Sequence, residues 1–458
     1  MSEHEFDVIV VGLGPGGEHV ALELAGAGLS VAGVEDRLVG GECPYWGCVP
    51  SKMMIRAANL LADGRRIPGM AGTSAVTPDW VTPDWKPVAA RIRDEATDNW
   101  DDAVAADRFT DAGATLYRGR GVLTAPGQVT VGASVLTARR GIVINCGTEP
   151  VIPPIPGLAG TPFWTNREAI ETEHVPDSLI VVGGGSIGVE LAQVFERFGT
   201  AVTVVEASSR LLPMDEPEAG DLIAKVFARE GIGVRLDAAE TEVRHADGTF
   251  MLTVSGGSPV SASRLLISAG RQTDLAALGV SAIGLDETAP TITVDEHMMA
   301  APGVWAIGDV VGHGAFTHMS VYHAEIVIAG ILGGPHHPAE YHAVPRVSFT
   351  DPEIGSVGMT EAQARAELAN VRVGSALVPS SARGWIHKAG NDGFIKLVAD
   401  ADRGVLVGAT AAGPAGGEVL SMLTLAVHAR VPVQRLREMI YAYPTFHGAV
   451  LDALGNLT

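Results

Sequence analysis

Two of the three cysteines in this sequence of 458 residues lie five positions apart, in the stretch Gly40-Gly41-Glu42-Cys43-Pro44-Tyr45-Trp46-Gly47-Cys48-Val49-Pro50-Ser51-Lys52. Such a pair can form a reversible disulfide, half of a zinc site, or two inert core thiols. On a regular helix their Cα atoms would be about 8.6 Å apart, beyond the ~7 Å limit for bridging. A Cys43–Cys48 disulfide therefore requires a distorted loop, which Gly47 and Pro50 can supply.

The surroundings of the pair favour redox chemistry. The sequence predicts a helix opening at Ser51, and a thiol near a helix N-terminus with Lys52 close by has a depressed pKa and is reducible when bridged. Zinc is disfavoured because no second Cys/His group follows at zinc spacing. The irregular spacing of six later histidines predicts solvated or capping side chains and no metal site: His313, His318, His323, His336, His337 and His342.

The first residues that could hold a cofactor follow a short apolar run, residues 6–11. Gly12, Gly14 and Gly17 form a GxGxxG turn before a helical pattern, and a second strand, residues 30–35, ends in Glu35. Such glycines let the backbone approach a pyrophosphate at a helix N-terminus, and an acid about 20 residues later holds a ribose hydroxyl. Since Glu35 lies 23 residues after Gly12, we predict a dinucleotide site.

The same unit recurs after residue 178. Gly183, Gly185 and Gly188 form the turn, and Glu206 ends the next strand, again 23 residues after the first glycine. Two dinucleotide sites imply two cofactors, between which a hydride must pass.

The pattern of strands and helices in the rest of the chain predicts an α/β protein. Residues 121–137 read as a β-meander, residues 264–270 as a strand and turn, and residues 303–309 as a buried strand ending in Asp309. From residue 344, strands and helices alternate without a nucleotide turn, an α+β pattern. The remaining cysteine, Cys146, is expected to be a buried small hydrophobe.

Composition limits the class of protein. The length suits about three domains, and 47% hydrophobic residues are ample for large cores. A formal net charge of −21 makes nucleic acid and anionic membranes unsuitable partners. No apolar run reaches the ~18 residues of a membrane span, and the acidic residues 1–7 do not resemble a secretion signal, so a cytoplasmic protein is expected.

Together these motifs resemble the flavin-dependent pyridine nucleotide–disulfide oxidoreductases, the family of glutathione reductase, dihydrolipoamide dehydrogenase, mycothione reductase and mercuric reductase. The resemblance covers essentially the whole chain, and its GGxCxxxxCxPSK pattern is highly specific. It implies two Rossmann-like dinucleotide-binding domains and a C-terminal α+β interface domain, hence a homodimer. The expected division is residues 1–152 with 281–343 for FAD, 153–280 for NAD(P), and 344–458 for dimerisation.

The family pattern can be carried over residue by residue. FAD would be held by Gly12, Gly14, Gly17, Glu35, Gly308 and Asp309, with Lys52 near the isoalloxazine. The nicotinamide cofactor would be held by Gly183, Gly185, Gly188 and Glu206, with Glu190 beside both rings, and Gly270 is also assigned to cofactor binding.

The resemblance also implies a direction of electron flow, from nicotinamide to FAD and then to the disulfide. Cys48 would be the thiolate facing the flavin, and Cys43 the thiol that attacks the substrate. Because Glu206 repels a 2′-phosphate, NADH is expected to be preferred, with NADPH possible through Arg210.

The sequence departs from the family near its C-terminus. Relatives carry a His-Pro-Thr followed by Glu as an acid–base pair, whereas Tyr443 and Gly448 stand at those positions here. Tyr443 could donate a hydrogen bond instead, and His447 could take over the acid–base role. A missing general acid favours a substrate with a good leaving group.

The aromatic pair between the cysteines is the other departure. Tyr45 and Trp46 would either stack on a flat substrate or fill the cleft wall. A substrate that is flat and has a good leaving group would fit both departures. A heteroaromatic or thione-type disulfide has these properties, and ergothioneine disulfide is one example. Alternatives are a quinone reductase, a mercuric-reductase-like metal reductase, a dihydrolipoamide dehydrogenase and a non-enzymatic redox sensor.

Overall fold

The structure is a computed structural model that describes residues 2–72, 82–335 and 337–458. The chain divides into two compact units. The first comprises residues 1–51, 90–151 and 271–340, and the second comprises residues 52–89, 152–270 and 341–458. The division expected from the family, into three domains, stays a prediction.

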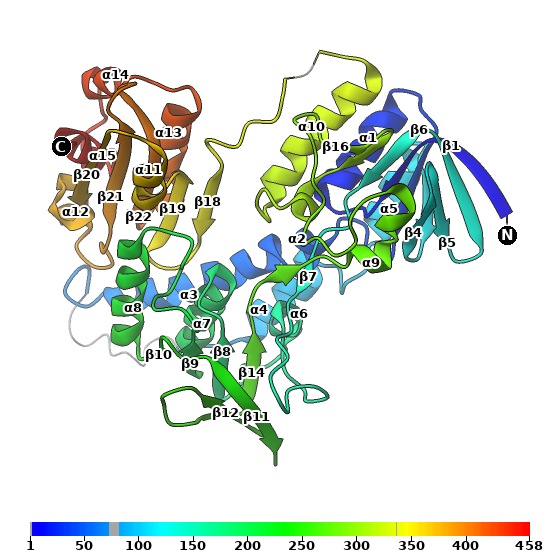
Figure 1. The fold of residues 1–458 in the computed structure, drawn as a ribbon. Helices are drawn as coiled ribbons and strands as arrows, with labels where there is room; N and C mark the ends of the chain where they lie inside the picture. Colours follow the sequence, from blue (N-terminus) through cyan, green and yellow to red (C-terminus); the bar gives the residue numbers. More distant parts are fainter. Residues whose placement is uncertain (1, 73–81, 336) are drawn as a thin grey trace. The chain divides into compact units, whose positions relative to one another are not determined.

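The first unit is built on a largely parallel sheet in the order β16-β17-β6-β1-β2-β3 (Figure 1). Its parallel strands are β1 (Ser2–Val11), β2 (Val31–Glu35), β3 (Thr115–Arg118), β6 (Ser134–Ile144) and β17 (Val304–Ala306), and β16 (Met299–Ala301) runs antiparallel to β17. All five residues of β2 are buried, as expected of a parallel strand covered on both faces. β4 (Gly121–Ala125) and β5 (Gln128–Val131) extend β6 as the predicted meander.

Two long helices of this unit pack together: α1 (Pro15–Gly26) and α10 (Thr317–Leu332), drawn side by side in blue and yellow-green in Figure 1. A Cβ on Gly16 of α1 would clash with Ser320 of α10, so glycine permits this close approach. The other elements of the unit are α2 (Glu42–Tyr45), a π-helix (Ile92–Ala96), α5 (Ala103–Asp111), β7 (Glu149–Pro150) paired with β15 (Arg271–Gln272), α9 (Leu275–Leu278) and 3₁₀ turns at Val280–Ile283 and Gly308–Val311.

Helix α3 (Cys48–Arg66) begins in the first unit and continues into the second. Met54, Ala58 and Ala62 are buried along it at a spacing of four residues, which is the stripe by which a helix packs on a core. In the second unit it is followed by α4 (Lys86–Arg91) and α6 (Asn166–Glu171).

The second unit contains a four-stranded parallel sheet in the order β10-β9-β8-β14. These strands are β8 (Ser178–Val182), β9 (Ala201–Val205), β10 (Gly233–Arg235) and β14 (Arg264–Ile267), with helices α7 (Ser186–Arg197) and α8 (Pro217–Glu230). A small antiparallel sheet, β11 (Glu240–Ala246), β12 (Thr249–Val254) and β13 (Val260–Ala262), packs on it through Phe250 and Leu252.

The same unit ends in a five-stranded antiparallel sheet, β18-β19-β22-β21-β20. Its strands are β18 (Pro345–Ser348), β19 (Glu353–Gly358), β20 (Val371–Leu377), β21 (Phe394–Asp400) and β22 (Val405–Gly413). Five helices and a 3₁₀ turn accompany it: α11 (Glu361–Glu367), Val378–Ser380, α12 (Ala382–His387), α13 (Gly416–His428), α14 (Val433–Glu438) and α15 (His447–Gly455). None of the described helices is long and apolar enough to cross a membrane.

Candidate active site

The two cysteines lie on either side of a break between helices. Cys43 is in α2, which ends at Tyr45, and Cys48 is the first residue of α3. The helix thus begins three residues before the predicted start at Ser51. Between them, a Cβ on Gly47 would lie 3.0 Å from the carbonyl oxygen of Glu42, so glycine allows the chain to turn tightly here. This break brings the two cysteine side chains into hydrogen-bonding contact.

The two thiols of the pair differ in their surroundings. The hydrogen bond to Cys48, together with burial, raises the pKa of the Cys43 thiol, although the hydroxyl of Thr317 acts in the opposite direction. Cys48 is exposed, and its Sγ lies 3.6 Å from Thr317 Oγ1. In the reduced pair this arrangement keeps the proton on Cys43.

Thr317 is a site residue that the sequence analysis missed. It is the first residue of α10, and the preceding residue, Phe316, provides no side-chain cap for that helix. The helix N-terminus and the Thr317 hydroxyl therefore both favour negative charge at the sulfurs. No local pattern marks this threonine, because it is 269 residues from Cys48.

The glycines before the pair hold the redox loop against the first glycine-rich turn. Gly41 has a φ of +69°, and a Cβ there would lie 2.7 Å from Gly14 Cα. The Gly40 N–H donates to the Leu13 carbonyl at 2.7 Å. The Cys43 segment and the N-terminus of α1 are thereby fixed to one another.

The first glycine-rich turn has the geometry of a mononucleotide cradle. Gly12 has a φ of +90°, a conformation that favours glycine, and a Cβ on Gly17 would clash with the Gly12 carbonyl. Helix α1 has Gly14 as its N-cap, with no side-chain hydrogen bond to its first N–H groups. Glu35 accepts the N–H of Leu13 at 2.7 Å, and burial raises the pKa of its carboxyl group.

The second turn repeats this geometry. Gly183 has a φ of +104°, and a Cβ on Gly188 would clash with the Gly183 carbonyl. Gly185 is the N-cap of α7, again without a side-chain cap. Glu206 accepts the N–H groups of Gly184 and Ser208 at 2.6 and 2.7 Å. The two repeats seen in the sequence therefore also share a hydrogen bond, from the N–H after the first glycine to the acid.

A polar residue after a neighbouring strand supports each turn, and neither was predicted. Asn145, following β6, donates from Nδ2 to the Gly12 carbonyl at 3.4 Å. Ser268, following β14, donates from Oγ to the Gly183 carbonyl at 3.1 Å. Sequence spacing could have located both, since each follows the fourth parallel strand of its sheet in chain order.

Asp309 lies in the 3₁₀ turn after β17, where burial raises the pKa of its carboxyl group. Its Oδ2 accepts the hydroxyl of Thr148 at 3.0 Å. Arg271, directly after Gly270, donates to Oγ1 and to the carbonyl oxygen of Thr148 at 2.7 and 2.6 Å. Gly270 has a φ of +109°, so it turns the chain that presents Arg271.

Lys52 and Glu190 form an ion pair within the second unit, with Nζ 2.8 Å from Oε2. The other carboxylate oxygen of Glu190 accepts the N–H of Phe349 at 2.7 Å, and the Lys52 ammonium lies 4.7 Å from the centre of the Phe349 ring. Glu190 is buried with only 5% exposure, so this pair is fixed in place.

The two C-terminal candidates are not fixed in this way. Tyr443 is 83% exposed, and His447, half-buried, is the first residue of α15. Other large apolar side chains of the C-terminal sheet and its helices are also exposed: Leu377, Trp385, Ile386, Leu425 and Ile440. Such a surface is suited to covering by another protein chain.

Two expectations from the sequence need correction. Cys146 is exposed and not a buried hydrophobe. His323 is not solvated, since it is fully buried. Of the two alternatives for the aromatic pair, filling the wall suits Tyr45, which is buried, whereas Trp46 is half-buried. His336 lies outside the described residues. Among those described, no three His, Cys, Asp or Glu side chains gather as metal ligands.

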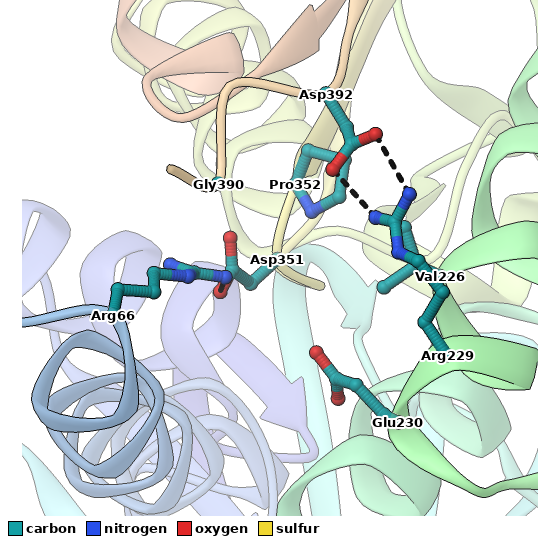
Figure 2. A pocket seen from close by; sticks show the side chains of 8 residues that line it. All are labelled: Arg66, Val226, Arg229, Glu230, Asp351, Pro352, Gly390 and Asp392. Atoms are coloured by element: carbon teal, nitrogen blue, oxygen red, sulfur yellow. Dashed lines mark hydrogen bonds and ion pairs between the residues drawn. The ribbon is translucent and has the colours of Figure 1, made fainter. Parts of the chain in front are cut away.

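A cavity of about 250 Å³ lies within the second unit (Figure 2). It is lined by Arg66, Val226, Arg229, Glu230, Asp351, Pro352, Gly390 and Asp392. Figure 2 shows Arg66 directed at Asp351 and Arg229 paired with Asp392, which the distances of 2.6 Å and 2.5 Å confirm. None of the predicted site residues lines this cavity, and its charges are paired within the protein.

Comparison with known proteins defines the family. Residues 6–325 match the model of the pyridine nucleotide-disulphide oxidoreductases, and residues 344–454 match the dimerisation domain of the same family. The chain is 32% identical over 461 residues to a dihydrolipoyl dehydrogenase of Chlorobaculum tepidum, covering 98% of this chain and 96% of that protein. It is 30% identical over 450 residues to a mercuric reductase of Acidithiobacillus ferrooxidans, covering 96% and 80%.

A solved structure extends the likeness to three dimensions. The copper(II) complex of the HOCl-induced flavoprotein disulfide reductase RclA from Escherichia coli superimposes with a TM-score of 0.86 at 25% identity, and the match covers 99% of both chains. The chain thus belongs to the class I pyridine nucleotide–disulfide oxidoreductases, a family that binds FAD and uses a pyridine nucleotide. Its dimerisation domain supports a homodimer.

Proposed function

We propose that this enzyme reduces a low-molecular-weight disulfide with electrons from NADH, through the Cys43–Cys48 pair. The observation that carries the proposal is the contact between the two cysteine side chains across the α2–α3 break, with Thr317 hydrogen-bonded to both. Two cysteine side chains in such contact are suited to forming a reversible disulfide. The family membership supports the same chemistry.

The residues present fit FAD in the first unit. The uncapped N-terminus of α1 would bind the pyrophosphate, Glu35 a ribose hydroxyl, and Asp309 the ribitol. The carboxylates of Glu35, which is buried, and Asp309, which is half-buried, are the kind of group that a cofactor hydroxyl satisfies. FAD held by these residues would supply the transfer of an electron pair from the reduced nicotinamide to the disulfide.

The cysteines then carry out two exchange steps. The sulfur of Cys43 attacks one sulfur of the substrate disulfide, so that a Cys43–substrate bond forms and the first thiol leaves. Cys48 then attacks Cys43, which releases the second thiol and restores the Cys43–Cys48 disulfide. Each turnover consumes one NADH, one proton and one disulfide, and gives NAD⁺ and two thiols.

The first step requires Cys43 to lose its proton. The hydrogen bond to Cys48 and burial raise the pKa of Cys43 and so oppose this loss. Cys43 therefore still needs a base, the role that the family gives to its His and Glu, and the leaving thiol still needs a proton.

The preference for NADH rests on Glu206. Its two oxygens accept backbone N–H groups, so the carboxylate is fixed where the ribose of a nucleotide on α7 would lie. Arg210, the candidate for a 2′-phosphate that the sequence suggests, donates to the Pro213 carbonyl at 2.7 Å and is thereby held away from that role.

Replacing Glu206 by glutamine tests this preference. We expect the ratio of kcat/KM for NADH to that for NADPH to fall by about tenfold, because a negative charge beside the 2′-phosphate is removed. Steady-state kinetics with both cofactors measure the ratio. Glu35→Gln, the equivalent change in the first repeat, is the control and should alter FAD retention while leaving the ratio unchanged. An unchanged ratio in Glu206→Gln would contradict the assignment.

The substrate proposal rests on the C-terminal departure and on Trp46. Tyr443 and Gly448 stand at the positions of the usual acid–base pair, with His447 as a candidate for the acid–base role, and Trp46, three residues after Cys43, offers a half-buried aromatic surface. A flat disulfide with good leaving groups, of the heteroaromatic or thione type, suits both features. Ergothioneine disulfide is one such compound.

A panel of disulfides graded by the pKa of the leaving thiol checks this proposal. Heteroaromatic disulfides should exceed alkyl ones in kcat/KM by roughly 10²-fold or more, the contribution a general acid normally makes. His447→Asn should slow the alkyl disulfides more than the heteroaromatic ones if the imidazole protonates the leaving thiol. Equal rates across the panel would show that leaving-group quality does not select the substrate.

A further inference from the structure

One face of α10 carries three polar side chains spaced three residues apart: Thr317, Ser320 and His323. Residues at this spacing lie on neighbouring parts of one helix surface. Thr317 contacts the cysteine pair, whereas the other two side chains are buried, with 6% and 0% exposure. Buried polar side chains in a helix need a partner, and both have one.

Ser320 is bonded to the first glycine-rich turn through Asn145. Its hydroxyl donates to Asn145 Oδ1 at 3.0 Å, and Asn145 in turn donates to the Gly12 carbonyl. In the second dinucleotide unit the counterpart of Asn145 is Ser268, whose hydroxyl bonds only to the Val182 and Gly183 carbonyls among the described residues. The additional bond to a helix is thus a feature of the first unit.

His323 is bonded to the turn that carries Asp309. The Gly308 N–H donates to His323 Nδ1 at 3.2 Å. Burial lowers the pKa of His323 to about 4, so the imidazole is neutral at physiological pH and Nδ1 keeps the lone pair that accepts this bond. Gly308 has a φ of +77°, and a Cβ there would lie 2.8 Å from Ser320 Oγ.

We propose that Ser320 and His323 are positioning residues for FAD, which fix the Gly12 turn and the Gly308–Asp309 turn to one rigid helix. Neither side chain needs to contact the cofactor. The two turns are expected to hold opposite ends of the same molecule, the pyrophosphate and the ribitol, so their relative placement determines how tightly FAD is bound. This inference rests on the FAD site assigned above and adds residues to it.

The test compares His323→Leu with His323→Asn. Leucine removes the acceptor, whereas the asparagine Oδ1 lies near the position of Nδ1 and can accept the Gly308 N–H. We expect the FAD dissociation constant to rise about tenfold or more in His323→Leu, the effect of leaving one buried donor unpaired, and to return toward the wild-type value in His323→Asn. The measurement is the fluorescence of FAD released from the holoenzyme on dilution.

Ser320→Ala provides an independent measure, because a smaller side chain at this site cannot crowd the fold. Its FAD dissociation constant should also rise several-fold, while the KM for NADH stays unchanged. Ser268→Ala, which removes the hydroxyl that supports the turn of the second repeat, should do the reverse, raising the KM for NADH and leaving FAD binding intact. The Ser320→Ala measurement decides the question even if His323→Leu does not fold.

Wild-type FAD affinity in both Ser320→Ala and His323→Leu would overturn the proposal, as would equal losses in the leucine and asparagine variants. These outcomes leave the disulfide reductase function untouched. Conversely, a protein that loses FAD as predicted but reduces no disulfide would keep this inference and refute the proposed function.

Discussion

Replacing Cys43 by serine is expected to lower kcat/KM for disulfide reduction by on the order of 10³-fold or more, since the nucleophile that forms the mixed disulfide is lost. The serine hydroxyl has a similar shape and keeps a hydrogen bond to Cys48, so the fold and the bound cofactors should persist. The assay is the oxidation of NADH in the presence of a heteroaromatic disulfide, followed alongside the thiols released.

An assay with a quinone as electron acceptor distinguishes a disulfide reductase from a quinone reductase. If the enzyme reduces disulfides through the pair, Cys43→Ser loses that activity but still passes electrons to the quinone. Cys146→Ser is the matched control, because this third cysteine is exposed and lies outside the α2–α3 break. Full disulfide reduction by Cys43→Ser would contradict the proposed route and favour direct reduction by the flavin.

The largest expected effect on stability comes from Arg197, which is only 1% exposed within the second unit. Burial alone would lower the pKa of its guanidinium, but the hydrogen bonds and charges of Glu230 and Asp351 outweigh it, and the pKa is raised. The guanidinium donates to Glu230 at 2.6 Å, to Asp351 at 2.9 Å and to Asn59 at 2.6 Å. It thereby joins α3, α7, α8 and the segment before β19.

Arg197→Met should lower the free energy of unfolding by about 3–5 kcal/mol, because Glu230 and Asp351 are left with less compensation for their charges. Denaturant unfolding of the holoenzyme measures this change. Arg229→Met is the matched control, at the cavity that Glu230 and Asp351 also line (Figure 2): its pair with Asp392 is exposed, and such a pair contributes less than about 1 kcal/mol. Equal losses in the two variants would contradict the account of the buried network.

The parts of the fold that follow from local sequence were predicted. The turns at Gly12 and Gly183 each occupy a few consecutive residues, and their acids Glu35 and Glu206 follow at a fixed spacing. Their shared hydrogen bonds show why the spacing is informative, since each acid must reach back to the N–H after the first glycine. The meander at residues 121–137 was confirmed for the same local reason.

Strands without a clear pattern were missed. β19 (Glu353–Gly358) contains two glycines and lacks regular alternation, and β20 (Val371–Leu377) is a weakly buried edge strand. Both are strands because they pair with β22 and β21, an effect of tertiary contacts that local propensity does not carry.

The missed site residues are those whose roles depend on distant contacts. Ser320 and His323 read as ordinary helical positions, and only the close packing of α1 on α10 shows that they are buried. Thr148 is defined by contacts with Asp309 and Arg271, more than 100 residues away. For Tyr45 the sequence left two alternatives open, stacking on a substrate or filling the wall of the cleft, because aromatic character alone does not show whether a side chain is exposed or buried.

The most direct test of the central claim is a count of thiols after anaerobic addition of one equivalent of NADH to the oxidised holoenzyme. The chain contains three cysteines, so the oxidised protein should present one thiol, that of Cys146, to an alkylating reagent under denaturing conditions. The account predicts three thiols after NADH, because the Cys43–Cys48 disulfide has taken the electron pair. A count that stays at one, with NADH consumed, would show that the electrons remain on the flavin and that the cysteines lie outside the electron path.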